Sequence, residues 1–208
     1  MKKSDVMAVF SAFRDANPEP RGDLLFRNPF ELLVAVVLSA QATDRVVNQV
    51  TPALFAAAPD PHAMVVLGEE GIRSYIHTVG LYNTKARHIH LLSGELLRRH
   101  GGEVPDRREA LEALPGVGRK SANVVLNVVF GQPTLAVDTH VFRVANRTGL
   151  AAGKTPLQVE ELLLARVPPP FLLHAHHWLI LHGRHVCQAR RPRCEGCLIR
   201  RWCALGKE

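Results

Sequence analysis

A short segment with two glycines, residues 114–122, presents a lysine at a position suited to chemistry. The segment reads Leu-Pro-Gly-Val-Gly-Arg-Lys-Ser-Ala, and its lysine is Lys120. Gly116 and Gly118 favour a sharp turn, and the sequence that follows predicts a helix over about residues 119–129. The backbone N–H groups of such a turn and the positive end of the helix together favour an anionic oxygen, such as that of a nucleic-acid phosphate.

An acidic residue further along the chain can return to this turn. The predicted helix spans about 15 Å, and residues 130–138 can extend over about 25 Å. Asp138 can therefore lie beside Lys120, where an amine and a carboxylate could carry out nucleophilic and acid–base chemistry. Asp138 also precedes a helical pattern at residues 141–147, so we expect it to cap that helix. His140 is a neighbour of the same site.

Taken alone, the segment could instead be an ordinary turn between two helices. In that interpretation, Leu114 and Val117 only pack the turn against the core. The charge of Arg119 and Lys120 and the reach of Asp138 favour the chemical interpretation.

All four cysteines lie near the C-terminus, at Cys187, Cys194, Cys197 and Cys203. Such a set can enclose one tetrahedral sulfur site, which by ligand type means zinc or an iron–sulfur cluster, and spacing alone leaves both open. The loop between the first two cysteines carries Arg190, Arg191 and Arg193. A rigid centre would present these arginines to phosphates, although they could instead only balance thiolate charge.

These motifs resemble those of the helix-hairpin-helix DNA glycosylases, and most closely those of the endonuclease III family. The resemblance rests on residues 114–127, 136–147 and 177–184 and on the cysteine spacing, and it extends over nearly the whole chain. It implies DNA glycosylase and AP lyase activity, with Lys120 as the nucleophile and Asp138 as the catalytic carboxylate. It also implies that the four cysteines bind one [4Fe-4S] cluster.

The implied reaction is excision of an oxidised pyrimidine from double-stranded DNA, followed by cleavage of the abasic site. The damaged nucleotide must rotate out of the helix, because its sugar carbon cannot be attacked while the base is stacked. Lys120 then attacks C1′, the base leaves, and the imine permits β-elimination of the 3′ phosphate. Asp138 either accepts the lysine proton or stabilises positive charge on the sugar as the base departs.

Two further turns carry side chains that could meet DNA. The first follows an apolar helix predicted over residues 30–38, and Asp44 is expected to cap the next helix, which leaves Ser39 and Gln41 on an exposed corner. By resemblance, Gln41 enters the duplex where a nucleotide has been flipped out. Ser39, Asp44 and His140 are the expected residues of the damage pocket.

The second turn, residues 80–86, also has a glycine and a basic residue ahead of a predicted helix. Leu81 or Tyr82 could wedge into the base stack, and Lys85 could contact a phosphate. Alternatively, Leu81 and Tyr82 only staple the helix that follows.

The overall charge fits a polyanionic partner. Lys and Arg total 26 against 19 Asp and Glu, which gives a net charge of +7, although a merely basic protein has the same balance. The most apolar window, residues 32–42, is about half the roughly 20 residues needed to cross a membrane, and the N-terminus lacks an export signal. We therefore expect a cytoplasmic, nucleoid-associated monomer without a membrane, acting on duplex DNA that contains oxidised pyrimidines or abasic sites.

An all-α fold is predicted, because helical spacing recurs and alternating strand patterns with hairpin turns are missing. The resemblance implies two helical lobes with the active-site cleft between them. Residues 22–133 would form a six-helix, barrel-like domain with the helix-hairpin-helix, and residues 1–21 and 134–208 the iron–sulfur cluster domain. Pro52 is expected to kink or shorten its helix.

Two other functions compete with this one. A monofunctional adenine mismatch glycosylase resembles the chain in its cysteine spacing but lacks the lysine nucleophile, so Lys120 argues against it. A non-catalytic helix-hairpin-helix module for DNA binding or redox sensing would need the turn but not the chemistry. Five histidines lie between residues 174 and 185, without a paired carboxylate, and are assigned to packing or hydrogen bonding rather than to a metal.

Overall fold

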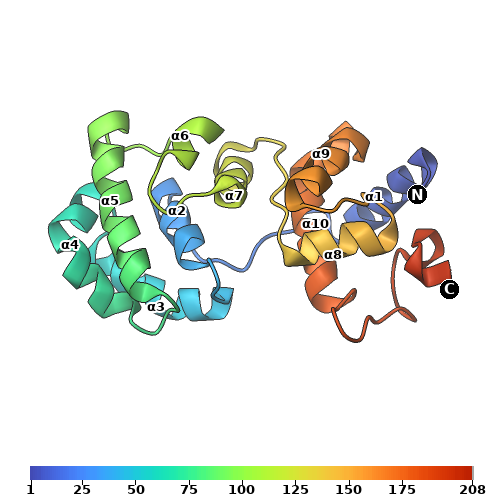
Figure 1. Ribbon diagram of the computed structural model, residues 1–208, viewed down its shortest axis with the longest axis horizontal. Coiled ribbons are helices and arrows are strands. Elements are labelled where there is room, and N and C mark those ends of the chain that lie inside the picture. The colour runs from blue at the N-terminus through green and yellow to red at the C-terminus, as the bar shows by residue number, and fades with distance from the viewer. Residues whose placement is uncertain (208) are drawn as a thin grey trace. The chain divides into compact units, whose positions relative to one another are not determined.

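The computed structural model describes residues 1–207, and every regular element in that part of the chain is helical. This confirms the all-α prediction. The chain divides into two compact units, one of Met1–Gly22 with Gly131–Glu208 and the other of Asp23–Phe130 (Figure 1). Each unit has its own hydrophobic core.

The unit Asp23–Phe130 is built around one buried helix. Residues 30–38 of α2 are all buried, as expected for a helix that is apolar on every side. Within this unit α2 packs against α3, α5 and α7 (Figure 1). The helices of the unit are α2 (Pro29–Leu38), α3 (Asp44–Ala57), α4 (Pro61–Ile76), α5 (Tyr82–His100), α6 (Arg108–Glu112) and α7 (Arg119–Phe130).

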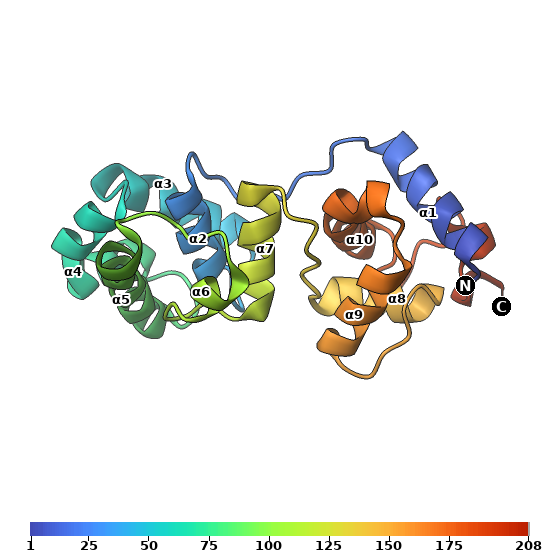
Figure 2. The ribbon, with the colours of Figure 1, turned by 90° about the horizontal axis from the view of Figure 1, so that it is seen from above.

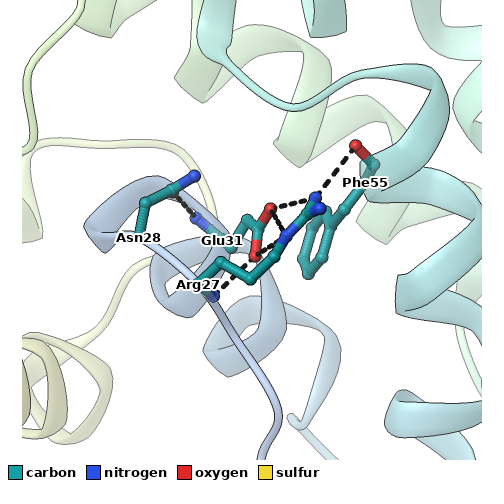
Figure 3. Close-up of polar contacts among 4 residues, drawn as sticks. All are labelled: Arg27, Asn28, Glu31 and Phe55. Carbon is teal, nitrogen blue, oxygen red and sulfur yellow. Dashed lines mark hydrogen bonds and ion pairs between the residues drawn. The ribbon is translucent and has the colours of Figure 1, made fainter.

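A buried carboxylate fixes the N-terminal end of α2 (Figure 3). Glu31 is 1% exposed, and its oxygens accept from the backbone N–H of Arg27 at 2.7 Å and from the Arg27 guanidinium at 2.6 and 2.9 Å. The Asn28 side chain in turn accepts from the Glu31 N–H at 2.9 Å. An unpaired buried carboxylate would be costly, so these bonds are what allow it here. They hold the helix whose other end leads into the Ser39–Gln41 corner.

Two local predictions in this unit were wrong, namely that Pro52 shortens its helix and that Asp44 caps it. The helix α3 continues through Pro52 to Ala57, with Pro52 exposed on its surface, so the proline does not shorten it. The break lies instead at Gly68 inside α4, where φ is 72°, a value that glycine adopts at little cost. The cap of α3 is Thr43, whose side chain accepts from the Val46 N–H, and Asp44 is the first helical residue rather than the cap.

The second unit contains α1, α8, α9 and α10 (Figure 2). Its core includes a group of aromatic side chains. Phe10 contacts Phe13, Phe171 and Trp178, with ring centroids 5.9 to 6.2 Å apart. The Trp178 indole N–H donates to the Asn17 carbonyl at 2.8 Å, so the ring's polar end is satisfied. The elements are α1 (Lys3–Ala16), α8 (Thr139–Thr148), α9 (Pro156–Arg166) and α10 (Leu172–His185), with short 3-10 turns at Pro169–Phe171, Arg200–Trp202 and Leu205–Lys207.

Within residues 1–207, no single helix has both the length and the apolar character needed to cross a membrane. The pair α3 and α4 passes on length and composition only when taken together, and it is bent by 114°.

Three of the histidines on α10 are buried, which agrees with the predicted packing role: His176, His177 and His182. Burial lowers the pKa of His177, and the nearby charge of His174 lowers it further. The His177 Nδ1 atom is buried without a hydrogen-bond partner in the described chain, and the ring packs beside Gly22 and His176. Burial therefore disfavours the charged form of His177 in the native protein.

This arrangement predicts a loss of stability in mild acid. As the pH falls below about 6.5, the unfolded chain binds a proton at His177 more readily than the folded chain does, so the free energy of unfolding falls. Urea unfolding between pH 7.5 and 5.5 measures this slope. We expect a smaller slope in His177→Phe and the wild-type slope in His62→Gln, which changes an exposed histidine. Equal slopes in His177→Phe and the wild type would contradict the assignment.

Candidate active site and cysteine cluster

The helix-hairpin-helix is formed by α6, a glycine turn and α7. The Leu114 carbonyl accepts from the Val117 N–H at 3.1 Å, with Pro115 and Gly116 at the two central positions of the turn. Gly116 has φ 80°, as position three of a type II turn requires. A Cβ atom there would lie 2.8 Å from the ring of His88 on α5. Both the backbone and this neighbour therefore demand glycine, and His88 is a structural partner of the turn that the sequence did not reveal.

Lys120 lies on the first turn of α7 and is exposed. The Gly118 carbonyl accepts the first bond of the helix, from the Ala122 N–H at 2.9 Å. Gly118 and Arg119 are also exposed, whereas Leu114 and Val117 are buried in the core of the unit. The packing interpretation and the chemical interpretation thus apply to different residues of the same segment. The lysine amine stands at the positive end of a helix and is open to a ligand.

Asp138 is the N-cap of α8, as predicted. Its Oδ1 atom accepts from the backbone N–H groups of His140 at 2.9 Å and Val141 at 2.8 Å. Its second oxygen, Oδ2, takes no hydrogen bond from the described residues, and the side chain is half-buried. One oxygen therefore fixes the carboxylate, which leaves the other available to a substrate.

Lys120 and Asp138 belong to different units. The structure gives the surroundings of each residue. That Asp138 lies close to Lys120, as the length of the chain between them allows, stays a prediction.

Two arginines of α8 hold the start of the cysteine loop. Arg143 donates to the Cys187 carbonyl at 3.0 Å and to the Gly183 carbonyl at 2.8 Å, and it lies 3.2 Å from the Nδ1 atom of His140. One turn later, Arg147 donates to the carbonyls of Gln188 and Ala189, both at 2.7 Å. The loop is thereby fastened to the helix that Asp138 caps. No local pattern signals these bonds, because the acceptors lie 40 to 44 residues further along.

The four cysteines are free and gathered in one region. Burial raises the pKa of the Cys197 thiol, and charge on Cys203, Cys194 and Cys187 raises it further, while a backbone hydrogen bond from Ile199 acts in the opposite direction. The Cys197 sulfur is therefore within electrostatic reach of the other three cysteines. Within residues 1–207, no three His, Cys, Asp or Glu side chains are grouped closely enough to hold a single metal ion.

The surroundings of the cysteines are partly buried and basic. His182 is buried, with Nε2 3.7 Å from the Cys197 sulfur, and burial lowers the pKa of His182 to about 4. The imidazole is neutral near pH 7, so it contributes packing and a hydrogen bond rather than charge. The arginines of the loop, Arg190, Arg191 and Arg193, are all exposed, as a surface that meets phosphates requires.

The two other predicted DNA-contact turns both carry strained residues. Gln41 has φ 55° and Leu81 has φ 60°, and in residues 1–207 these are the only non-glycine residues with positive φ. A left-handed residue of this kind costs about 1–2 kcal/mol, so the surrounding structure must hold it. Both side chains are exposed, Leu81 by 58% despite being apolar. Strain and exposure at loop tips are typical of a functional surface.

Two residues beside these tips, Tyr82 and Ser39, have structural roles. Tyr82 begins α5 and packs against the core of its unit, as the stapling interpretation predicts. Ser39 is the C-cap of α2, and its hydroxyl donates to the Val36 carbonyl at 2.8 Å.

The predicted phosphate contact of Lys85 is wrong. The side chain is only 4% exposed, and its ammonium donates to the carbonyls of Leu38 at 2.8 Å and Ala40 at 2.6 Å. Burial lowers the pKa of Lys85. The Lys85 ammonium is thus hydrogen-bonded inside the unit and is not available to a phosphate at the surface.

Comparison with known proteins identifies the family. Residues 34–169 match the HhH-GPD superfamily of base excision DNA repair proteins. Endonuclease III of Escherichia coli (strain K12) is 56% identical over 203 residues, which cover 98% of this chain and 96% of the relative. Endonuclease III of Treponema pallidum (strain Nichols) is 58% identical over 198 residues, 95% of this chain and 94% of the relative. The chain belongs to the endonuclease III family.

The fold agrees with that of a solved endonuclease III. The structure of a trapped endonuclease III–DNA covalent intermediate matches with a TM-score of 0.92 and 42% identity, over 100% of this chain and 98% of that chain. Endonuclease III is a DNA glycosylase with AP lyase activity, and this member of the family is such an enzyme in base excision repair.

Proposed function

We propose that this enzyme removes oxidised pyrimidines from double-stranded DNA and nicks the resulting abasic site through an imine formed on Lys120. The observation that carries the proposal is the exposed Lys120 amine on the first turn of α7, directly behind a type II glycine turn. The similar endonuclease III captured as a covalent intermediate with DNA supports it.

The proposed reaction uses one amine for two bond cleavages. The neutral Lys120 nitrogen attacks C1′ of the flipped nucleotide, and the bond from C1′ to the base breaks, so that the base leaves with the electron pair and takes up a proton. The sugar ring opens to give an imine between Lys120 and C1′. The imine acidifies the hydrogens at C2′, and loss of one of them expels the 3′ phosphate by β-elimination. Water then releases the lysine.

In this scheme Asp138 uses its two oxygens differently. Oδ1 holds the orientation of the carboxylate through the N–H groups of His140 and Val141. The carboxylate held in this way can accept the lysine proton or stabilise positive charge on the sugar as the base departs.

The proposed DNA surface follows the same exposed residues. Gln41 and Leu81 enter the opened base stack, the hairpin at Gly116 and Gly118 receives a phosphate, and Arg119 adds positive charge beside it. We place Ser39, Asp44 and His140 around the damaged base. The proposal extends to a monomer that works in the cytoplasm on nucleoid DNA, in keeping with a net charge of +7.

We further propose that Cys187, Cys194, Cys197 and Cys203 hold one [4Fe-4S] cluster. The chemistry of the donor set fits: four free cysteines, three of them within electrostatic reach of Cys197, in a segment that Arg143 and Arg147 bind to α8. When bound, the cluster supplies a rigid cross-link for a tail with little hydrophobic core of its own. It thereby holds Arg190, Arg191 and Arg193 ready for phosphates.

The cluster proposal predicts an iron protein whose DNA affinity depends on the cysteines. Purified protein should absorb visible light and contain iron rather than zinc. Cys197→Ser should lose iron, and the salt dependence of its DNA affinity should flatten by about 0.9 in log–log slope for each phosphate that the loop no longer binds. Arg21→Ala removes an exposed arginine of the same unit outside the loop, and it should keep the wild-type slope. A colourless protein with stoichiometric zinc would contradict the cluster.

Borohydride trapping on a duplex with one oxidised pyrimidine tests the proposed function itself. A covalent protein–DNA adduct together with strand nicking is the expected result. Base release from an adenine mismatch without an adduct would indicate the monofunctional alternative. Binding without base release or nicking on either duplex would indicate a non-catalytic module.

A further inference from the structure

The two strained tips, Gln41 and Leu81, lie next to each other although they are 40 positions apart in the chain. A Cβ atom on Gly80, the residue before Leu81, would be 3.7 Å from the Gln41 carbonyl oxygen, so the two backbones almost touch. Both tips belong to the unit Asp23–Phe130. They therefore form one paired projection, which we call the double tip.

One residue is hydrogen-bonded both to Leu81 and to the segment that leads into Gln41. The backbone N–H of Lys85 donates to the Leu81 carbonyl at 3.0 Å. Its side-chain ammonium donates to the carbonyl of Ala40, the residue before Gln41, at 2.6 Å, and to that of Leu38 at 2.8 Å. Lys85 thus joins the start of α5 to the end of α2.

The bonds of the Lys85 ammonium to the Leu38 and Ala40 carbonyls suit a structural cross-link rather than a reactive group. Leu38 is the last residue of α2, so the ammonium binds at the negative end of that helix, where backbone carbonyls lack helical partners. The side chain is buried, and burial lowers its pKa, yet the two short bonds keep the charged donor satisfied. Loss of the ammonium would leave two carbonyls at the base of the Gln41 corner without their donor.

We propose that Lys85 is a positioning residue that holds Gln41 and Leu81 together in their left-handed conformations, as a double tip shaped in advance to open a base pair. The inference rests on the proposed function, because it assigns to Lys85 a part of the same duplex-opening step. Preorganisation of this kind avoids ordering two loops at the moment of binding. Lys85 touches neither the damaged base nor the reacting sugar.

The test compares a lesion in a fully paired duplex with the same lesion in a bubble of unpaired bases, which needs no opening. Lys85→Met keeps the aliphatic stem and removes both side-chain bonds. We expect kcat/KM to fall about 10-fold or more on the paired duplex and to change by less than about 2-fold on the bubble, because an unpaired base has little stacking to lose. A 2-aminopurine placed opposite the lesion should fluoresce less with Lys85→Met than with the wild type, since it reports the opened stack.

Two further variants separate positioning from folding. Lys85→Arg can still donate to both carbonyls and should recover part of the loss on the paired duplex. Ile72→Val trims a fully buried side chain on α4, away from the double tip, and should affect both substrates equally.

The outcomes are distinguishable. If activity of Lys85→Met falls equally on both substrates, in step with the amount of folded protein, Lys85 is merely structural and the inference fails. Wild-type activity and fluorescence of Lys85→Met on the paired duplex also refute it, while a trapped adduct with the wild type leaves the proposed function standing. A wild type that forms no adduct and opens no duplex refutes both.

Discussion

Replacing Lys120 with glutamine is expected to abolish borohydride trapping and to slow strand cleavage by at least about 10³-fold, because loss of a covalent nucleophile removes the whole reaction path. The fold should be unaffected. Lys120 is exposed, and a surface substitution of this kind usually changes the free energy of unfolding by no more than about 0.5 kcal/mol. Trapping, nicking and thermal unfolding, measured on the same preparation, check the three expectations together.

The neighbouring arginine provides the matched control. Arg119 is also exposed on the first turn of α7, and Arg119→Gln removes one positive charge without removing the amine. We expect this variant to bind DNA more weakly while still forming the adduct. If the adduct persists in Lys120→Gln, another amine is the nucleophile, and the assignment of Lys120 is wrong.

The features that the sequence predicted well are those in which neighbouring residues decide the geometry. Pro115 and Gly116 favour a type II turn whatever surrounds them, and the turn is there. Asp138 could be assigned as an N-cap because the donors it prefers are the N–H groups two and three residues later. At α3 the predicted cap was wrong by one residue. The cap is Thr43 and not the adjacent Asp44, since either side chain can accept a hydrogen bond at a cap position.

The features that the sequence could not predict depend on residues distant along the chain. Lys85 resembles a phosphate-binding lysine ahead of a helix, but the carbonyls it binds lie 45 and 47 residues earlier. Its burial follows from how α5 packs against the end of α2, which no local pattern encodes. The same holds for Arg143, whose acceptors include the Cys187 carbonyl, and for His88, which excludes a side chain at Gly116.

The positive φ values of Gln41 and Leu81 are a further feature that neighbouring residues do not predict. Neither residue type favours the left-handed region, so local preference predicts an ordinary turn at each position. Tertiary contacts override that preference at both tips. Sequence reasoning placed Gln41 at the DNA only through the family resemblance and left Leu81 open between wedge and staple, whereas strain and exposure single out both residues from the structure alone.

Asp138→Asn is expected to slow lesion processing by about 100-fold or more while leaving the protein as stable as the wild type. Asparagine caps a helix about as well as aspartate, so the bonds from His140 and Val141 to the side-chain oxygen can persist. Only the negative charge and the basic oxygen are lost, and acid–base or electrostatic assistance of this type contributes about 10²–10⁴-fold. Single-turnover kinetics and thermal unfolding measure the two effects.

Asp60 offers a matched control for the cap. It is the N-cap of α4, where its carboxylate accepts from the Ala63 N–H at 2.8 Å, and it has no assigned role in the reaction. Asp60→Asn should therefore preserve both stability and activity. By contrast, Asp138→Ala removes the cap as well as the charge and should cost about 1 kcal/mol of stability. Full activity in Asp138→Asn would mean that the carboxylate is only a cap.

Asp138→Asn also distinguishes the two chemical roles of Asp138 when its substrate is a preformed abasic site. Such a substrate has already lost its base, so no positive charge develops on the sugar through base departure. If Asp138 stabilises that charge, Asp138→Asn should excise the lesion slowly but cleave the preformed site at nearly the wild-type rate. If Asp138 instead accepts the proton of Lys120, imine formation is slowed on both substrates, and the two rates should fall together, because attack by the amine comes before β-elimination in each case.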